Sequence, residues 1–328
     1  MDPPFSFANI SDEEHEERTK LFGVNSTALD PVVTVPFDIY MPKAYALSAK
    51  KIYNFEVRPD DVWIVTYKKC GTTWTQEIVW NIMNDLNKEL GQQPLYARSP
   101  FLERQTLFSK HMIDEMTKNL TTEEATKINE LYTNSIEYTA SLSSPRIIKT
   151  HLPFDLLPPN LLDTGAKVVY VCRNPMDTCV SFYHHVAKIF KPLYEFKGSF
   201  DQFVDLFMQG KLEQGGYFYH LKSAWNRRHS PNLKFVWYED MKKDPITEVT
   251  DLTRFLNHGL PQKTISDLVD YLDFSNVKER ASDQKKSFYR KGVVGDGANY
   301  FQGKRLELWN AWIAENVKGT DIKFTYNV

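Results

Sequence analysis

Four short apolar runs recur along the chain, and segments with helical spacing lie between or after them. The runs cover residues 62–67, 146–149, 167–172 and 233–238. The first run has no polar alternation and is rich in β-branched and aromatic side chains, which is typical of a strand buried on both faces. Apolar residues recur at helical spacing most clearly over residues 73–87, 175–187, 200–208, 217–228 and 246–256. Strands that alternate with helices predict an α/β fold with a central, mostly parallel sheet flanked by helices.

The length and composition suit one large domain. The chain has 328 residues, of which 42% are apolar and 14% aromatic, so it can bury a sizeable core. We expect residues 51–328 to form this single domain. Residues 1–50 are rich in proline, acidic residues and tyrosine, and we expect them to form an N-terminal arm packed on the domain.

The charge pattern and the cysteines exclude several classes of protein. A net charge of −2 and a pI near 6.5 argue against a nucleic-acid-binding protein. No apolar run approaches the length of a membrane span, and the acidic residues 1–18 lack the layout of a signal peptide. Cys70, Cys172 and Cys179 have no metal-ligand spacing and cannot all pair with one another. These features favour a reduced, cytoplasmic protein without a metal site.

The segment directly after the first predicted strand has the character of a phosphate site. It reads Lys69, Cys70, Gly71, Thr72, Thr73, Trp74 and leads into a predicted helix. A strand, a short turn with glycine and hydroxyls, and then a helix place backbone N–H groups at a positive helix end. The segment is not a Walker motif, because its lysine precedes the glycine and two threonines follow. An ordinary turn between strand and helix is the alternative reading.

Basic and polar residues also follow the other predicted strands. Lys149 and His151 follow the second strand, Arg173 and Ser181 follow the third, and Tyr238 ends the fourth. Ligands of parallel sheets gather at the carboxyl ends of the strands, so cations collected there favour a polyanion. Taken singly, each residue has a structural alternative, such as a histidine that caps a turn.

A glycine-rich segment far downstream adds two further cations. It begins with Arg290, Lys291 and Gly292 and shows little periodicity. It is either a surface loop with two solvated charges or a clamp for a phosphate group.

Together these segments resemble the cytosolic sulfotransferases, from about residue 67 to the loop after Arg290. The phosphosulfate loop of that family, Tyr-Pro-Lys-Ser-Gly-Thr-Thr-Trp, corresponds to residues 67–74. Its Lys-Thr-His-Leu-Pro segment is identical at residues 149–153. Its remaining motifs match Arg173, Asn174, Pro175, Asp177 and Ser181, then residues 238–240, then residues 290–296. The residues around these motifs, such as 76–80 and 84–87, are most similar to those of insect members, a branch that includes a retinol dehydratase.

The resemblance implies transfer of a sulfuryl group from 3′-phosphoadenosine-5′-phosphosulfate (PAPS) to an acceptor hydroxyl or amine, which leaves adenosine 3′,5′-bisphosphate (PAP). Lys69 to Trp74 would hold the phosphosulfate. The 3′-phosphate would be held by Arg173, Ser181, Arg290, Lys291 and Gly292, and the adenine would be framed by Trp74, Tyr238 and Phe274. Lys69 and Lys149 would stabilise the leaving phosphate, and His151 would act as general base. No metal is needed.

The chain departs from the family at several positions. Lys68 replaces the usual proline, and Gly297 stands where a tryptophan is common. Cys70 replaces a serine among amide donors, which predicts either a low pKa and easy alkylation or simple packing of a small sulfur. Asn299 to Glu307 lacks the family's dimer pattern, so monomer and homodimer both remain open.

The acceptor is expected to bind among aromatic segments outside the nucleotide motifs. Candidates are residues 95–102, residues 37–45 of the arm, and residues 182–194 with His184 and His185. They suit a phenol, catecholamine, steroid or retinoid-like alcohol, in keeping with detoxification or other small-molecule metabolism. Alternatives are dehydration of an allylic alcohol in the manner of retinol dehydratase, a non-catalytic binder of nucleotide or hydrophobic ligand, and, more weakly, a nucleoside kinase.

Overall fold

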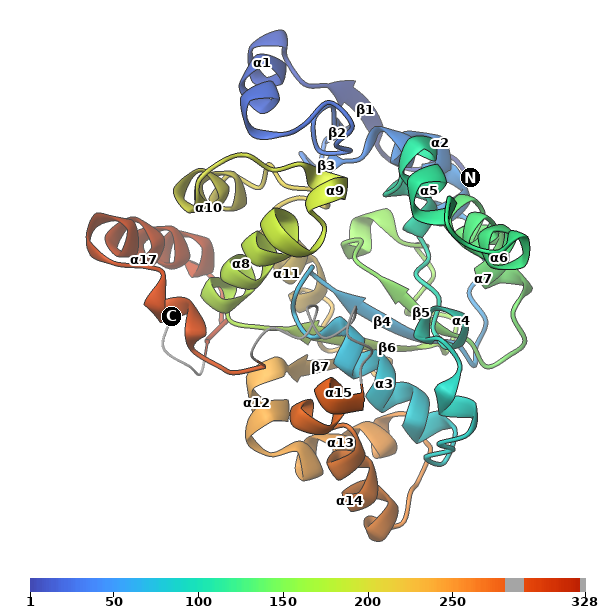
Figure 1. Cartoon of the computed structure of the whole chain (residues 1–328). Coiled ribbons are helices and arrows are strands. Elements are labelled where there is room, and N and C mark those ends of the chain that lie inside the picture. Colours follow the sequence, from blue (N-terminus) through green and yellow to red (C-terminus); the bar gives the residue numbers. More distant parts are fainter. Residues whose placement is uncertain (281–291, 325–328) are drawn as a thin grey trace.

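Four parallel strands form a sheet across the middle of the molecule (Figure 1). Their order is β5-β4-β6-β7, and they are β4 Val62–Thr66, β5 Ile147–Thr150, β6 Lys167–Cys172 and β7 Leu233–Trp237. This computed structural model describes residues 1–280 and 292–324. Strand β6 has the predicted bounds, and the other three differ from prediction by one residue at one or both ends. The predicted α/β fold with a parallel sheet is therefore confirmed.

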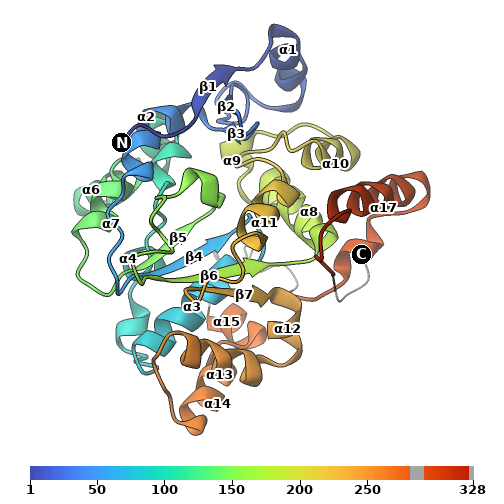
Figure 2. The same cartoon turned by 180° about the vertical axis from the view of Figure 1, so that it is seen from behind.

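Both faces of the sheet are covered by helices (Figures 1 and 2). Successive strand residues point to opposite faces, so Trp63 and Val65 join one hydrophobic cluster while Val62 and Ile64 join another. The first cluster includes residues of α2 Lys43–Tyr53, α8 Pro175–His184, α10 Phe200–Met208, α11 Tyr217–Trp225 and α17 Gly303–Val317. The second includes residues of α3 Thr72–Met83, α12 Tyr238–Lys243, α13 Pro245–Phe255 and α14 Gln262–Tyr271. Burial on both sides explains why β4 is apolar throughout.

Several helices end earlier than their apolar pattern predicts. Helix α3 ends at Met83 rather than near residue 87, because Asp85 and Leu86 take positive φ angles of 51° and 55° that a right-handed helix cannot contain. The regular part of α8 ends at His184 and continues as a π-helix, His185–Ile189. Helix α10 has the predicted bounds, while α11 and α13 begin or end within a few residues of them.

The remaining helices are short and mostly connect strands. Between α3 and β5 lie α4 Leu95–Arg98, α5 Lys110–Thr117, α6 Thr122–Thr133 and α7 Ser135–Ser141. Helices α9 Lys191–Tyr194 and α15 Phe274–Arg280 follow later in the chain. Single turns of 3-10 helix cover Leu90–Gln92, Arg104–Thr106, Phe154–Leu156 and Asp296–Asn299.

The N-terminal segment forms a small antiparallel sheet of its own. Its strands are β1 Ser6–Asn9, β2 Val32–Val35 and β3 Tyr40–Met41, with α1 Asp12–Leu21 between the first two. Phe5, Phe22 and Ile39 pack in the same cluster as Trp63 of the central sheet. Helix α2 runs across residue 50, and the division of the chain at that residue stays a prediction.

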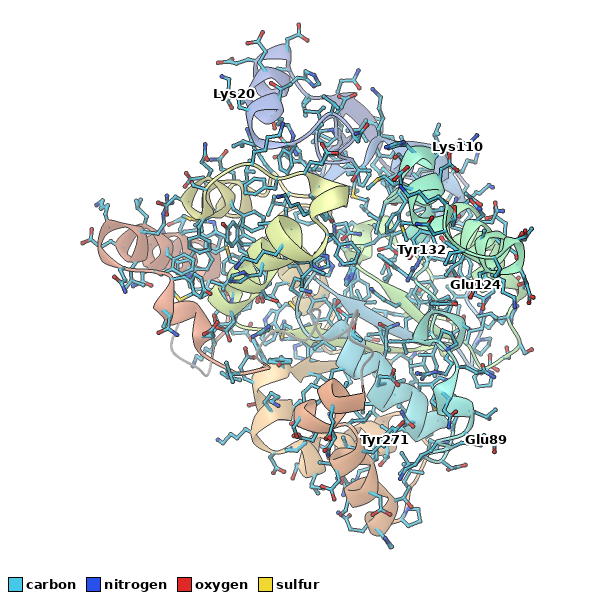
Figure 3. All side chains as sticks on the ribbon, viewed as in Figure 1. Lys20, Glu89, Lys110, Glu124, Tyr132 and Tyr271 are labelled. Carbon is cyan, nitrogen blue, oxygen red and sulfur yellow. The ribbon has the colours of Figure 1, made fainter. Side chains whose placement is uncertain are left out.

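The charged side chains labelled in Figure 3 lie on the outside of the molecule. Lys20, Glu89, Lys110 and Glu124 are all exposed. Tyr132, labelled in the same figure, packs its ring 4.5 Å from that of Phe108.

Over the described part of the chain, no helix has the length and apolar character that crossing a membrane requires.

A buried ion pair joins the segments that lead into β4 and β5. The Nε and Nη2 groups of Arg146 donate to the two carboxylate oxygens of Asp61 at 2.8 and 2.6 Å, and both side chains are at most 1% exposed. Asp61 also accepts from the backbone N–H of Arg58, and Arg146 also donates to the carbonyl of Glu56. The pair therefore holds the starts of two neighbouring strands together.

We expect Asp61→Asn to lower the free energy of unfolding by about 3–5 kcal/mol, because it leaves the Arg146 charge buried without a counter-charge. Urea unfolding followed by circular dichroism measures this loss. Asp30→Asn is the control, since Asp30 pairs with Lys43 at 2.7 Å but both side chains are largely exposed. It is expected to cost less than about 1 kcal/mol. Equal losses in the two variants would contradict the assignment.

Candidate active site

The carboxyl ends of the four parallel strands bring the predicted site residues to one edge of the sheet. In the ladder, Val65 of β4 pairs with Thr150 of β5, Thr66 of β4 with Val171 of β6, and Cys172 of β6 with Trp237 of β7. The residues that follow these pairs are Tyr67, His151, Arg173 and Tyr238. The expected convergence of motifs far apart in the sequence therefore follows from the observed register.

The loop between β4 and α3 has an unusual backbone. Lys69 has a φ of 69° and Gly71 a φ of 102°, both in the left-handed region. Gly71 immediately precedes α3, and a Cβ atom there would lie 2.6 Å from Cδ2 of Tyr238, so only glycine fits. The first N–H groups of a helix have no acceptor within it, and they lie at the positive end of its dipole. Thr72, Thr73 and Trp74 form this first turn, which is suited to a phosphate group.

Cys70 does not have the reactive thiol that an amide-rich loop suggested. Its side chain is fully buried, and Sγ lies 3.9 Å from the carbonyl of Lys68 and 3.7 Å from Oγ1 of Thr178. Burial raises the pKa of the Cys70 thiol to about 12, although Thr178 and the charge of Arg173 oppose the rise. The expectation of a lowered pKa was wrong, because the sulfur packs into the core beneath the loop.

His151 is held as a neutral imidazole whose free lone pair is on Nε2. Its side chain is buried, and Nδ1 lies 2.8 Å from the carbonyl oxygen of Thr66 and 3.0 Å from the Thr66 hydroxyl. A carbonyl oxygen can only accept, so Nδ1 carries the proton. Burial, followed by the nearby charge of Lys149, keeps the pKa of His151 well below its ordinary value.

Thr66 also connects His151 to the loop. Its hydroxyl lies 2.7 Å from Oγ1 of Thr72 at the start of α3. Both hydroxyls are buried, so the imidazole and the first turn of α3 are linked through one side chain at the end of β4.

The two lysines of the site lie in different surroundings. The ammonium group of Lys149 lies 4.1 Å from the centre of the Phe101 ring. Burial, followed by the charge of Arg104, lowers the pKa of Lys149 to about 7. Nζ of Lys69 lies 3.2 Å from Nδ1 of His185, and burial together with the charge of Lys69 lowers the pKa of His185 far below its ordinary value.

The neighbouring histidines 184 and 185 have different partners. Nε2 of His184 lies 2.9 Å from the hydroxyl of Tyr300, whereas His185 reaches the loop at Lys69. His185 is the first residue of the π-helix that continues α8, and this change of winding is not evident from the sequence.

Sequence reasoning missed Glu103. Its buried carboxylate accepts from the backbone N–H of His151 at 2.7 Å and from Nε2 of Gln214 at 3.2 Å. Burial raises the pKa of Glu103 to about 7, although hydrogen bonds from His151 and Thr150 and the charge of Lys149 oppose the rise. Glu103 follows no strand of the central sheet. It is placed by the parallel bridge between Phe101 and Lys149, and no local pattern marks that bridge.

Arg173 sits at the centre of a second part of the site. Its guanidinium donates to the carbonyls of Lys69 at 3.4 Å and Val293 at 3.3 Å and to Asp177 at 3.2 Å, and it lies 4.4 Å from the centre of the Tyr238 ring. Its Nε is buried without a hydrogen-bond partner among the described residues. Ser181 lies further along α8 and is half-buried.

The glycine-rich segment is held against α8. Asp177 accepts from the backbone N–H of Gly295 at 2.9 Å and of Gly297 at 2.7 Å. Gly292, with a φ of 66°, directly precedes Val293, the residue that contacts Arg173. Arg290 and Lys291 lie outside the described residues, so their expected role stays a prediction.

The departure at Gly297 has a steric reason. A Cβ atom there would lie 2.8 Å from Cγ of Met176 and 2.9 Å from the backbone nitrogen of Asp177. The close approach to α8 leaves no room for the tryptophan that the family pattern suggests at this position.

Trp74 and Tyr238 stand side by side at the edge of the site. Their ring centres are 5.8 Å apart in an edge-to-face arrangement, and Nε1 of Trp74 donates to the carbonyl of Leu272 at 2.9 Å. Phe274, expected beside them, begins α15, but its side chain lies outside the described part. In the described residues no cluster of three or more His, Cys, Asp and Glu side chains is arranged to hold a metal ion.

Comparison with known proteins agrees with this geometry. A family model described as "Sulfotransferase domain" matches residues 59–321. Sulfotransferase 1A1 of Rattus norvegicus is 34% identical over 297 residues, which are 86% of this chain and 93% of the relative. Sulfotransferase 1E1 of Homo sapiens is 32% identical over 299 residues, with coverages of 87% and 93%.

A solved structure of retinol dehydratase in complex with retinol and PAP is similar over 99% of this chain and 100% of that chain, with 30% identity and a TM-score of 0.88. The chain belongs to the sulfotransferase family. It is a PAPS-dependent sulfotransferase, built on a single α/β domain with the phosphosulfate-binding strand, loop and helix that the sequence predicted.

We expect Cys70 to resist alkylation in the folded protein. At pH 8, iodoacetamide should label it at least about 10²-fold more slowly than a small free thiol, because little thiolate forms and the sulfur is enclosed. Mass spectrometry of timed samples measures the rate, and labelling in urea confirms that all three cysteines react once exposed. Labelling of Cys70 as fast as the free thiol would contradict the burial described here.

Proposed function

We propose that this enzyme transfers the sulfuryl group of PAPS in line to the hydroxyl, or amine, of a small hydrophobic or phenolic acceptor, with His151 as general base. The observation that carries the proposal is the state of His151. Its Nδ1 proton is committed to the carbonyl of Thr66, and its depressed pKa keeps the Nε2 lone pair available to take a proton from the acceptor.

The donor groups of the site fit PAPS. The N–H groups at the start of α3 and the Lys69 side chain would hold the phosphosulfate, in which the sulfuryl group is bonded to a phosphate oxygen. Arg173, whose buried Nε lacks a partner among the described residues, would hold the 3′-phosphate with Ser181 and with Arg290, Lys291 and Gly292. Trp74 and Tyr238, which lie edge to face, would frame the adenine with Phe274.

Charge on the leaving phosphate would be stabilised by the two lysines. Lys149 is the third residue of β5, two residues before His151, and Lys69 lies in the loop at the start of α3. Fixed cations in a site that excludes water lower the energy of a developing anion more than they would in water. A contribution of about 10²–10³ to the rate from one of these lysines is typical of single charge-stabilising groups in other active sites.

The acceptor would lie on the aromatic side of His151. The Phe101 ring is centred 5.2 Å from the His151 ring, and the His185 and Phe190 rings are 4.5 Å apart. Such side chains suit a flat hydrophobic alcohol or phenol. The structures of retinol dehydratase that resemble this chain contain retinol and androsterone, which supports an acceptor of that class here.

A second candidate activity is dehydration of an allylic alcohol. The 30% identity and TM-score of 0.88 with retinol dehydratase favour it. In this reaction the sulfate ester would form first. The C–O bond would then break, sulfate would leave with its electron pair, and loss of a proton from carbon would supply the electrons of the new C=C bond. Chromatography of the products from labelled PAPS separates the two activities, since only sulfation accumulates the ester.

The cellular setting is also a proposal. All three cysteines are free and buried, which supports a reducing compartment such as the cytoplasm. Metabolism of small molecules, including detoxification, would suit the acceptor class, and the placement among insect enzymes stays a prediction from the sequence.

We expect His151→Ala to lower kcat by about 10²–10⁴-fold with the best acceptor found in a screen of phenols, catecholamines, steroids and retinoids. The affinity for PAP, measured by calorimetry, should stay near that of the unchanged enzyme, since the imidazole serves the acceptor. His258→Ala is the control, because Nε2 of His258 lies 3.0 Å from Asp85, whose side chain is largely exposed. Full turnover in His151→Ala would overturn the role of His151 as base.

We also expect PAP binding to take up a proton at pH 8. The pKa of Lys149 is about 7 without ligand, so at pH 8 the amine is mostly neutral, and a bound phosphate raises its pKa. About one proton per PAP should therefore be absorbed at pH 8. The affinity for PAP should fall as the pH rises above about 7, the pKa of Lys149 in the ligand-free protein. Calorimetry in buffers of different ionisation enthalpy measures the uptake.

Lys149→Met should remove most of this proton uptake, whereas Lys43→Met, at an exposed position, should leave it unchanged. The same uptake in both variants would assign the proton to another group.

A further inference from the structure

Lys68 is a buried cation directly beside the phosphosulfate loop. Its side chain is 7% exposed, and Nζ lies 2.8 Å from Oε2 of Glu213, whose side chain is 2% exposed. The ammonium group also lies 3.4 Å from the hydroxyl of Tyr194 and 5.5 Å from the centre of the Phe182 ring. This lysine stands where the family pattern has proline, so the core at the start of the loop contains a charge that proline would not supply.

Glu213 gathers hydrogen bonds from three separate parts of the chain. Besides Lys68, it accepts from Oγ1 of Thr27 at 2.7 Å and from the hydroxyl of Tyr194 at 3.0 Å. Burial by itself would raise the pKa of Glu213, but the charge of Lys68 and these hydrogen bonds bring the pKa below its ordinary value. The carboxylate is therefore ionised at neutral pH, and both of its oxygens have donors.

Residues 211–215, which we call the connector, contact Glu103 and Tyr67 on one side. Gln214 donates from Nε2 to Glu103, whose same oxygen accepts from the backbone N–H of His151. The carbonyl of Gly215 accepts from the hydroxyl of Tyr67 at 3.3 Å. The connector thus reaches the loop through Lys68 and Tyr67, and the base through Glu103.

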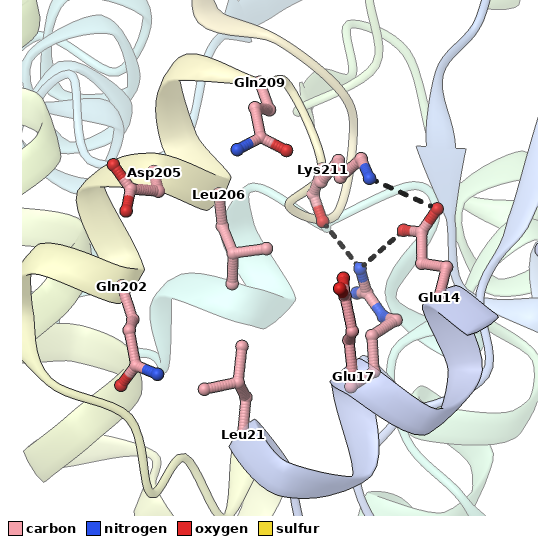
Figure 4. Close-up of a pocket in the computed structure, with 9 residues that line it drawn as sticks. Glu14, Glu17, Leu21, Gln202, Asp205, Leu206, Gln209 and Lys211 are labelled. Atoms are coloured by element: carbon pink, nitrogen blue, oxygen red, sulfur yellow. Dashed lines mark hydrogen bonds and ion pairs between the residues drawn. The ribbon is translucent and has the colours of Figure 1, made fainter.

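The N-terminal segment holds the connector from the other side. The backbone N–H of Gln214 donates to the carbonyl of Tyr40 at 2.7 Å. Arg18 of α1 donates to the carbonyl of Lys211 at 3.2 Å and also pairs with Glu14. Figure 4 shows the neighbouring ion pair between the Lys211 side chain and Glu14. With Thr27 on Glu213, three parts of the first 41 residues contact the connector.

The loop needs an anchor at residue 68. Lys69 keeps a left-handed backbone, which costs a residue other than glycine about 1–3 kcal/mol and persists only where the surroundings enforce it. A proline at position 68 would restrict φ by its ring, and lysine does not. Because a buried charge can be satisfied in few arrangements, the pair with Glu213 supplies a constraint from outside the loop.

We propose that Lys68 and Glu213 are positioning residues that fix the phosphosulfate loop for PAPS and make its geometry depend on the N-terminal segment through Thr27. The proposal rests on the proposed function only in that the loop holds the phosphosulfate. A buried ion pair can often be replaced by apolar groups without loss of stability, so stability and positioning can be separated by experiment.

The test compares Lys68→Met with the double variant Lys68→Met/Glu213→Leu. Lys68→Met leaves the Glu213 carboxylate buried without its cation, so we expect lower stability and weaker PAP binding. The double variant removes both charges and should regain much of the stability, but its affinity for PAP should stay about 10²-fold below that of the unchanged protein, because the loop is misplaced. Lys51→Met, at a largely exposed pair with Glu137, is the matched control.

Hydrogen exchange of residues 69–73 in the ligand-free protein gives a readout that needs no nucleotide. Faster exchange in the double variant than in the Lys51→Met control supports the proposal. Unchanged exchange together with unchanged PAP affinity would show that the pair is merely structural and overturn it. If the unchanged protein itself ignores PAP, the proposed function fails, while the exchange result still decides the inference.

Thr27→Val tests the link to the N-terminal segment. It removes one hydrogen bond to a charged group, the bond from Oγ1 of Thr27 to Glu213, at nearly constant volume. We expect PAP affinity to fall about fivefold or more, with faster exchange at residues 69–73. Affinity and exchange equal to those of the unchanged protein would overturn the dependence on this segment.

Discussion

The site depends on the contact between the end of β4 and the residue that follows β5. Thr66 is the last residue of β4, and its carbonyl and hydroxyl both meet Nδ1 of His151. The same hydroxyl meets Thr72 at the start of α3. Parallel pairing of β4 with β5 is what makes these contacts possible. One register therefore sets the tautomer of the imidazole and its position relative to the phosphate-binding turn.

Burial of several basic groups close to one another gives the site its electrostatic character. The pKa values of Lys149, His151 and His185 are all lowered, first by burial and then by neighbouring cations. Glu103, which accepts from the backbone N–H of His151, has its pKa raised by burial. Such a site gains most from a ligand with several negative charges, because the ligand supplies the counter-charge that the protein leaves out.

Two of the departures from the family pattern are explained by contacts between segments that are distant in sequence. At Gly297 the glycine-rich segment approaches α8 so closely that a Cβ atom would clash, and Asp177 of α8 accepts from the backbone N–H of Gly297. Lys68 pairs at 2.8 Å with the carboxylate of Glu213, which lies 145 residues later. In each case the substituted residue is compatible with the fold only because of a partner that is distant in sequence.

The sequence by itself determined the four strands of the central sheet, five of the helices that cover it (α3, α8, α10, α11 and α13) and the phosphate-binding turn, because periodicity, β-branching and the glycine before α3 act over a few residues. It did not predict the small N-terminal sheet or the other helices. It also brought Lys149, His151 and Arg173 to one edge, since parallel strands end on the same side. Only the tertiary structure decided which side chains are buried and what they face. It turned Cys70 inward, separated His184 from His185 at a change of helical winding, and placed Glu103 beside His151 and Glu213 beside Lys68. Burial and charges that are distant in sequence set the environment of these side chains, and a local sequence pattern predicts neither of them.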